Sequence, residues 1–145
     1  MINIDTILSI ANDEEFERIA IELFRHQAER CAPYGRYIKL LGIDPREVDT
    51  VEAIPFLPIE LFKSEDVYSA DTTLEVVFTP SNTGSTVASR HMMSDIKIYE
   101  HAFFSSFERF YSNVQGWSIY GLLPNYLQRE GSSLVYMVDK MIERS

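Results

Sequence analysis

A run of small polar residues lies between Phe78 and His91, and its residue types could bind an anion. It reads FTPSNTGSTVASRH, and its central positions are Ser81, Asn82, Thr83, Gly84, Ser85 and Thr86. Glycine, serine and threonine allow successive backbone N–H groups to converge on one point, and their hydroxyls add donors without bulk. Gly84 permits a positive φ, which asparagine also tolerates. With Arg90 as a nearby cation, this run could hold a phosphate group.

The same run also has a simpler interpretation, because small polar residues are common in ordinary turns. The chain has no Gly-Lys pair, which a Walker loop requires, and the run has one glycine where a dinucleotide loop needs three. Composition alone therefore favours a plain hairpin loop over a phosphate cradle.

Two short apolar segments should position the run. Residues 73–79 (TLEVVFT) are rich in β-branched side chains and predict a strand. Residues 87–93 (VASRHMM) could return beside it as an antiparallel partner. In such a strand Arg90 and His91 point to opposite faces, and we expect Arg90 to face the phosphate while His91 has a structural role.

The elements after this hairpin are predicted to be helix, strand and helix. Asp95 should cap a helix whose aromatic stripe packs in the core, although such a stripe could also line an acyl pocket. The stripe consists of Ile96, Tyr99, Phe103, Phe107, Phe110 and Val114. Residues 117–124 are a candidate third strand. A last helix should begin near Ser132 or Ser133 and turn these side chains inward: Leu134, Val135, Val138, Met141 and Ile142.

The first 70 residues read as a helical N-terminal region. Asn12 and Glu15 form a capping box, and the helix they begin should end near Cys31. Its expected buried face comprises Phe16, Ile19, Ala20, Leu23 and Phe24. A second helix should end at Gly42, and a turn-rich connection should contain a short helix at 59–63. The expected fold is mixed α/β (α+β): a helical cap over 1–70 and a partial sheet with flanking helices over 71–145, in one compact unit.

Composition excludes several classes of protein. The chain has 145 residues, 46% hydrophobic and 24% charged, which is typical of a globular domain. A net charge of -9 argues against nucleic-acid partners. The single cysteine, Cys31, excludes an internal disulfide, and we expect it to pack rather than react. His26 and His101 have no second ligand at metal spacing. No membrane span or leader is recognisable, so we expect a cytoplasmic protein.

The run and its surroundings resemble a known phosphate loop. FTPSNTGSTVASRH followed by SDIKIYEHAF is similar to the nucleotide-phosphate loop of the acyl-protein synthetase (LuxE-type) family, in the adenylate-forming (acyl-CoA synthetase-like) superfamily. Two flanking segments, PFLPIELFKS (55–64) and LLPNYLQREGSSLVYMVDKMI (122–142), resemble that family in the same order. The resemblance therefore covers most of the chain beyond residue 50.

The resemblance assigns positions one by one. Ser81, Thr83, Gly84, Ser85 and Thr86 match the phosphate loop, and Ser89, Arg90, His91 and Asp95 match the residues that follow it. The family's loop reads approximately Ser-Ser-Gly-Thr-Thr-Gly, whereas this chain has one glycine fewer. It also has Pro80, which lacks an amide donor.

The resemblance implies an enzyme that uses ATP and Mg²⁺ to activate a carboxylic acid, with a fatty acid as the expected substrate, and passes the acyl group to a thiol. The chain matches only the N-terminal portion of that family, so a C-terminal half would supply the remaining contacts. The alternative is a truncated, non-catalytic relative that serves as a binding or assembly module, with a second copy covering its apolar surface. A third interpretation is a small α/β domain with a hydroxyl-rich hairpin.

Overall fold

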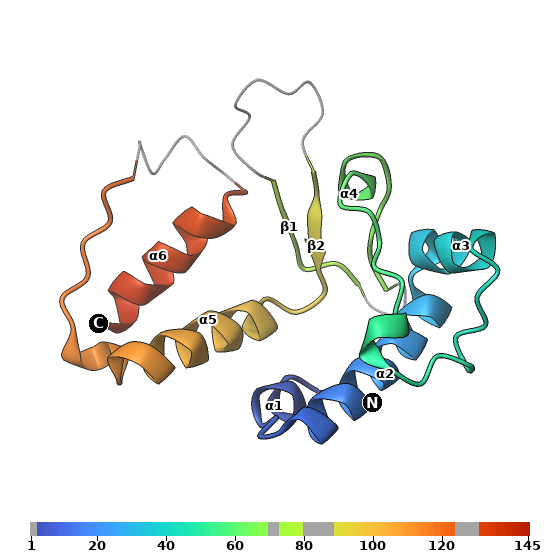
Figure 1. Cartoon of the computed structure of the whole chain (residues 1–145). Helices are drawn as coiled ribbons and strands as arrows, with labels where there is room; N and C mark the ends of the chain where they lie inside the picture. The colour runs from blue at the N-terminus through green and yellow to red at the C-terminus, as the bar shows by residue number, and fades with distance from the viewer. Residues whose placement is uncertain (1–2, 70–72, 80–88, 124–130) are drawn as a thin grey trace. The chain divides into compact units, whose positions relative to one another are not determined.

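The computed structural model describes residues 3–69, 73–79, 89–123 and 131–145, and the chain divides into two compact units, Met1–Thr73 and Leu74–Ser145 (Figure 1). The described residues are mostly helical, with one two-stranded antiparallel sheet. The expected mixture of helix and sheet is confirmed in this coarse form, as an α+β chain with little sheet.

The first unit contains five helical elements in its described part. These are α1 (Ile4–Leu8), α2 (Asp13–Arg30), α3 (Ala32–Leu40), the 3-10 helix η1 (Val51–Ala53) and α4 (Leu61–Ser64). The predicted start of α2 is confirmed by its hydrogen bonds. The Asn12 side chain accepts from the Glu15 amide at 2.9 Å, and the Glu15 carboxylate accepts from the Ala11 amide at 3.0 Å.

The end of α3 is a Schellman motif. Gly42 has φ of +70°, its amide donates to the Lys39 carbonyl at 3.1 Å, and the Ile43 amide donates to the Ile38 carbonyl at 3.3 Å. The predicted stop at Gly42 is therefore confirmed, because glycine adopts this left-handed conformation without a steric penalty.

The core of the first unit lies between α2, α3 and the segment that follows α3. Its buried residues are Phe24, Cys31, Tyr34, Ile38, Val48 and Ile54. The predicted inward position of Phe16 is wrong, since this side chain is 51% exposed. In α2 the first residue that packs on this cluster is Ala20, so the part of the helix before Ala20 lies outside the cluster.

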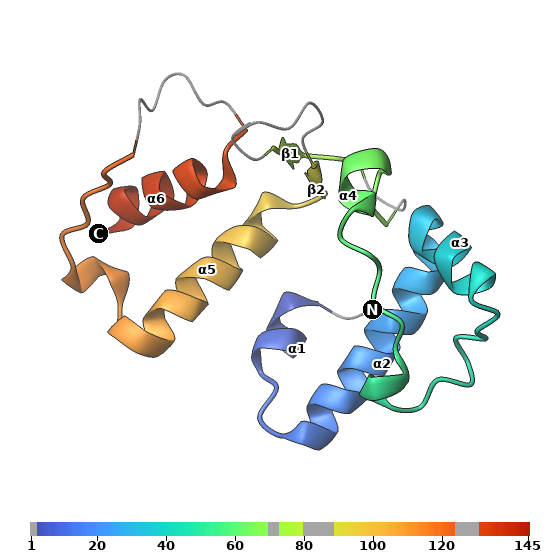
Figure 2. The same cartoon turned by 45° about the horizontal axis from the view of Figure 1, so that its top comes forward.

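The second unit is a hairpin followed by two long helices. β1 (Val76–Phe78) pairs antiparallel with β2 (His91–Met93), in the register Val76↔Met93, Val77↔Met92 and Phe78↔His91. The predicted hairpin is confirmed. It is followed by α5 (Ile96–Tyr111), the 3-10 helix η2 (Val114–Gly116) and α6 (Ser133–Arg144). In both helices, α5 and α6, the N-terminal end is the end nearer to the hairpin (Figures 1 and 2).

The aromatic stripe of α5 is only partly buried. Phe103 and Phe104 are buried, as is Val114, whereas Phe110 is 82% exposed, so its predicted burial is wrong. The partly buried residues packed on this cluster are Tyr99, Phe107, Ile119, Tyr136, Met137 and Met141. Leu134 and Ile142 are also exposed, contrary to the prediction. Apolar residues at steps of three and four mark one face of a helix, whereas burial depends on where the neighbouring helix crosses that face.

The predicted third strand is not formed over the described residues 117–123. β-rich composition indicates that a segment can pair, but a strand needs a hydrogen-bonding neighbour. The hairpin strands pair with each other, and residues 117–123 lie against α6 instead: a Cβ on Gly121 would lie 2.7 Å from Cγ1 of Val138.

Candidate functional site

The candidate site is the loop that connects β1 and β2. Its six predicted ligand residues, Ser81, Asn82, Thr83, Gly84, Ser85 and Thr86, lie outside the described residues. The structure does describe the two stems of this loop, through Thr79 on one side and from Ser89 on the other.

The strand register fixes which side chains share a face at the loop's base. The register ends at the pair Phe78↔His91, so Thr79 and Arg90 are the next residues on the two stems. Side chains alternate along a strand, so Arg90 belongs to the face of Val77, and His91 belongs to the face of Phe78. Arg90 and His91 are both exposed, and the expectation that Arg90 rather than His91 faces a phosphate stays a prediction.

The first stem is joined directly to the start of α6. The Thr79 amide donates to the Gly131 carbonyl at 2.8 Å, and Gly131 precedes Ser132, the N-cap residue of α6. Gly131 has φ of +88°, and a Cβ there would lie 3.1 Å from the Thr79 hydroxyl oxygen. The chain therefore enters the loop beside the N-terminus of a 12-residue helix, where backbone N–H groups carry partial positive charge.

Three aromatic rings pack against one another beside this junction. Phe78 is 4% exposed, and its ring centroid lies 5.5 Å from that of Tyr99 and 5.6 Å from that of Tyr136. The Tyr99 hydroxyl donates to the Ser133 carbonyl at 3.2 Å, which links α5 to the first turn of α6. These contacts tie β1, α5 and α6 together beside the first stem of the loop.

The Tyr136 hydroxyl donates to the Glu100 carboxylate at 2.5 Å, adding a polar link between α6 and α5. Burial of the ring and the Glu100 acceptor both raise the pKa of Tyr136 above its usual value. Tyr136 therefore remains a neutral hydrogen-bond donor at neutral pH, suited to holding the helices rather than to proton transfer.

The N-terminus of α5 is already occupied by protein carboxylates. Asp95 accepts from the Lys97 amide at 2.9 Å, and Glu75 accepts from the Ile96 amide at 2.8 Å. Asp95 thus acts as the predicted cap. Because two carboxylates use the exposed amides of α5, an anion beside the hairpin is favoured at the start of α6 instead.

The other residues considered from the sequence lie elsewhere. Cys31 is 5% exposed within the core of the first unit, so its thiol packs among apolar side chains. His26 and His101 are exposed on α2 and α5. Among the residues that the structure describes, no three potential metal ligands come together.

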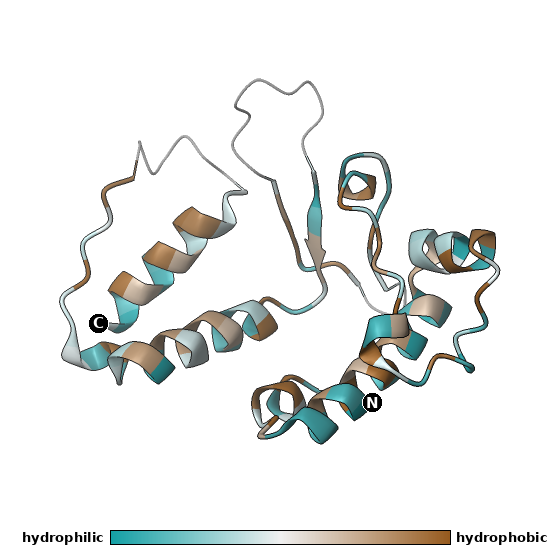
Figure 3. Ribbon diagram, viewed as in Figure 1, coloured by the Kyte–Doolittle hydropathy of each residue, from teal (hydrophilic) through white to brown (hydrophobic). Residues whose placement is uncertain are grey.

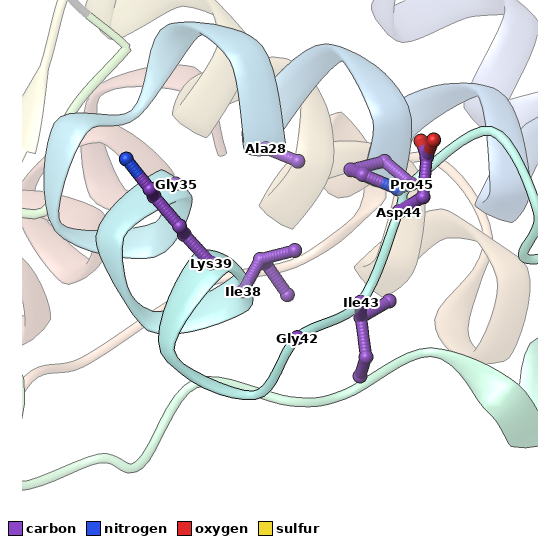
Figure 4. Close-up of a pocket in the computed structure, with 8 residues that line it drawn as sticks. All are labelled: Ala28, Gly35, Ile38, Lys39, Gly42, Ile43, Asp44 and Pro45. Atoms are coloured by element: carbon purple, nitrogen blue, oxygen red, sulfur yellow. The ribbon is translucent and has the colours of Figure 1, made fainter.

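A pocket of about 500 Å³ opens in the first unit, and the sequence did not predict it (Figure 4). Its lining residues are Ala28, Gly35, Ile38, Lys39, Gly42, Ile43, Asp44 and Pro45. Figure 4 shows Lys39 and Asp44 on opposite sides of the pocket, whose other lining residues are apolar or glycine. The Asp44 carboxylate is paired with Arg46 at 2.6 Å, and this hydrogen bonding lowers the pKa of Asp44 to about 2. The pocket therefore offers apolar contact rather than a catalytic group.

Sequence reasoning missed two residues that position the loop, Gly131 and Glu75. Gly131 precedes a serine pair at a helix start, which is a local signal for a tight turn, but its contact with Thr79 joins residues far apart in the chain. Glu75 caps a helix that begins 21 positions later, and no local pattern predicts such a cap.

Comparison with known proteins gave no match to a family model, a curated protein or a solved structure. Over the described residues, no helix is both long and apolar enough to cross a bilayer.

Proposed function

We propose that this chain is the N-terminal part of an acyl-protein synthetase-like, adenylate-forming ligase, and that the loop between β1 and β2 binds the phosphates of ATP. The observation that carries the proposal is the hydrogen bond between the Thr79 amide and the Gly131 carbonyl. It brings the first stem of a hydroxyl-rich loop beside the N-terminus of α6. Backbone amides of the loop and of a helix start are complementary to phosphate oxygens.

In this proposal the residues have distinct roles. Backbone N–H groups and hydroxyls of Ser81, Thr83, Ser85 and Thr86 donate to phosphate oxygens, and Gly84 allows the required turn. Arg90 adds a positive charge from the second stem. Asp95 and Glu75 hold the start of α5, and thereby the end of β2, through their caps.

The chemistry implied is acid activation in two steps. A carboxylate oxygen attacks the α-phosphorus of ATP, the bond to the bridging oxygen breaks, and pyrophosphate leaves with that electron pair. A thiolate then attacks the carbonyl carbon of the acyl adenylate, and AMP leaves. Donors aligned on the β- and γ-phosphates stabilise the charge that moves onto pyrophosphate, and Mg²⁺ bound to the nucleotide would supply further charge neutralisation.

The test is a titration of the ¹⁵N-labelled chain with MgATP, followed by amide NMR. We expect saturable shifts confined to residues 79–91 and to the first turn of α6. The double variant Ser85→Ala/Thr86→Ala should weaken them. The matched control, Ser105→Ala/Ser106→Ala, removes two adjacent hydroxyls from α5 and should leave the titration unchanged.

Absence of any saturable shift at millimolar MgATP would reject nucleotide binding by this chain. That result would favour the second candidate, a non-catalytic binding or assembly module. A specific observation favours this candidate too: several large apolar side chains of the second unit are exposed, as described next.

A further inference from the structure

Residues 118–123 form a strand-like segment that has no strand partner among the residues that the structure describes. They run as a drawn-out coil between η2 and the last described residue before α6 (Figures 1 and 3). In the part of the chain that the structure describes, their backbone makes no hydrogen bond with another residue. Isoleucine and tyrosine at positions 119 and 120 favour β structure, so this segment has both the composition and the free backbone groups of an edge strand.

Side chains of this segment differ in burial: Ile119 and Leu123 are partly buried, whereas the residues between them are exposed. Ile119 packs on the core cluster of α5 and α6, and Gly121 lies against Val138. Between and beyond them, Tyr120 is 87% exposed and Leu122 is 100% exposed. The outer face of this segment is thus apolar and uncovered, which is unusual for an exposed strand in a monomer.

An aromatic cluster adjoins the segment and enlarges this apolar surface. The Tyr111 ring centroid lies 6.4 Å from that of Phe110 and 5.9 Å from that of Trp117, and all three side chains are largely exposed. With about 200 Å² for a whole aromatic side chain, these three and Tyr120 together expose about 500 Å². A stable interface buries about 800 Å² per partner, so with Leu122 they supply most of one partner's share.

The charge of the second unit allows two copies to approach each other. Residues 74–145 contain seven acidic and six basic side chains, whereas residues 1–73 contain fifteen acidic and seven basic ones. Most of the chain's net charge of -9 therefore lies outside the unit that carries the apolar surface. A nearly neutral surface favours self-association, because like-charge repulsion between the copies is small.

We propose that residues 118–123 pair with the same segment of a second copy, as antiparallel strands related by a two-fold axis. Each copy supplies the N–H and C=O groups that the other lacks, and Tyr120 and Leu122 of the two copies meet on the outer face. The aromatic cluster of Phe110, Tyr111 and Trp117 extends the interface at its edge. This inference does not depend on nucleotide binding.

The test measures the mass of the full chain in solution by sedimentation velocity across a range of concentrations. We expect a reversible dimer of twice 16.7 kDa at high concentration. Leu122→Lys should make the chain monomeric, because it would bury an ammonium group of each copy against Tyr120 of the other within an apolar interface. The matched control is Leu40→Lys at a leucine of the first unit that is 86% exposed, and it should leave the dimer intact.

Hydrogen exchange provides a second measurement that does not need a variant. The amides of residues 118–123 should become protected as the concentration of the unaltered chain rises. A chain that stays monomeric at all concentrations would overturn the proposal, and so would a dimer that Leu122→Lys leaves intact. If Leu122→Lys proves unfolded by circular dichroism, exchange protection at 118–123 in the unaltered chain decides the question.

Discussion

The backbone amide of Thr79 donates to the carbonyl of Gly131 at 2.8 Å, so the first stem of the hairpin loop is joined to the residue that introduces α6. The two residues are far apart in the chain, yet this contact determines where the hydroxyl-rich run leaves β1. The conformation of Gly131 makes the junction sensitive to substitution.

Gly131→Ala should destabilise the second unit. Gly131 has φ of +88°, and an added Cβ would lie 3.1 Å from the Thr79 hydroxyl oxygen, so alanine would be strained in conformation and close in contact. We expect a loss of about 1–2 kcal/mol in the free energy of unfolding, measured by urea denaturation. Gly116→Ala is the matched control, because a Cβ at Gly116 meets nothing within 4 Å. Equal stability of the two variants would contradict this account of the junction.

Arg90→Ala should weaken MgATP binding if the loop binds phosphate as proposed. Removing a guanidinium beside the loop should raise the dissociation constant about tenfold, equivalent to about 1.4 kcal/mol, in an NMR or calorimetric titration. Arg109→Ala is the control, since it removes the same charge near the far end of α5. An unchanged affinity in Arg90→Ala would exclude Arg90 from the site while leaving the loop itself in question.

Arg25→Ala should destabilise the first unit. The Arg25 guanidinium donates to three backbone carbonyls of the segment after α3, those of Pro45 at 3.1 Å, Arg46 at 3.3 Å and Val48 at 2.9 Å. Their loss should lower the free energy of unfolding by about 1–2 kcal/mol.

Arg18→Ala is the matched control for Arg25, because it removes the same charge from α2 and breaks an exposed ion pair with Glu22 at 3.8 Å. Such pairs contribute less than about 1 kcal/mol. Comparable effects of the two substitutions in urea denaturation would show that the carbonyl contacts of Arg25 contribute little.

Tyr34 should make the stability of the first unit depend on alkaline pH. Its hydroxyl donates to the Pro55 carbonyl at 2.8 Å, and burial, with smaller effects from Tyr37 and Cys31, raises the pKa of Tyr34 to about 12. An unfolded tyrosine ionises near pH 10, so the unfolded state loses its proton first. The stabilisation linked to this proton is therefore complete below about pH 10 and is lost as the pH rises towards about 12.

Urea denaturation at several alkaline pH values tests the role of Tyr34. Tyr34→Phe should flatten the decline of stability between pH 10 and 12, because phenylalanine has no proton to lose. Tyr120→Phe removes an exposed hydroxyl instead and should leave the decline as it is. The same pH dependence in all three proteins would rule out Tyr34 as its source.

The sequence alone determined the features that depend on neighbouring residues. Asn12, Glu15 and Asp95 cap helices through hydrogen bonds to amides two to four positions away, and Gly42 ends α3 through its own backbone conformation. The hairpin was also predictable, because its two strands are close in the chain and rich in β-forming residues. For the same reason the sequence could identify the hydroxyl-rich run as the connection between them.

Only the tertiary structure decided which predicted faces are buried and what lies beside the loop. Phe110 continues the aromatic stripe of α5 but remains exposed, and residues 117–123 have a strand composition but no strand partner among the described residues. Likewise, nothing near Thr79 in the sequence indicates that Gly131 will accept its hydrogen bond. Burial and pairing depend on which distant segment arrives as a neighbour, and short-range propensities contain little information about that choice.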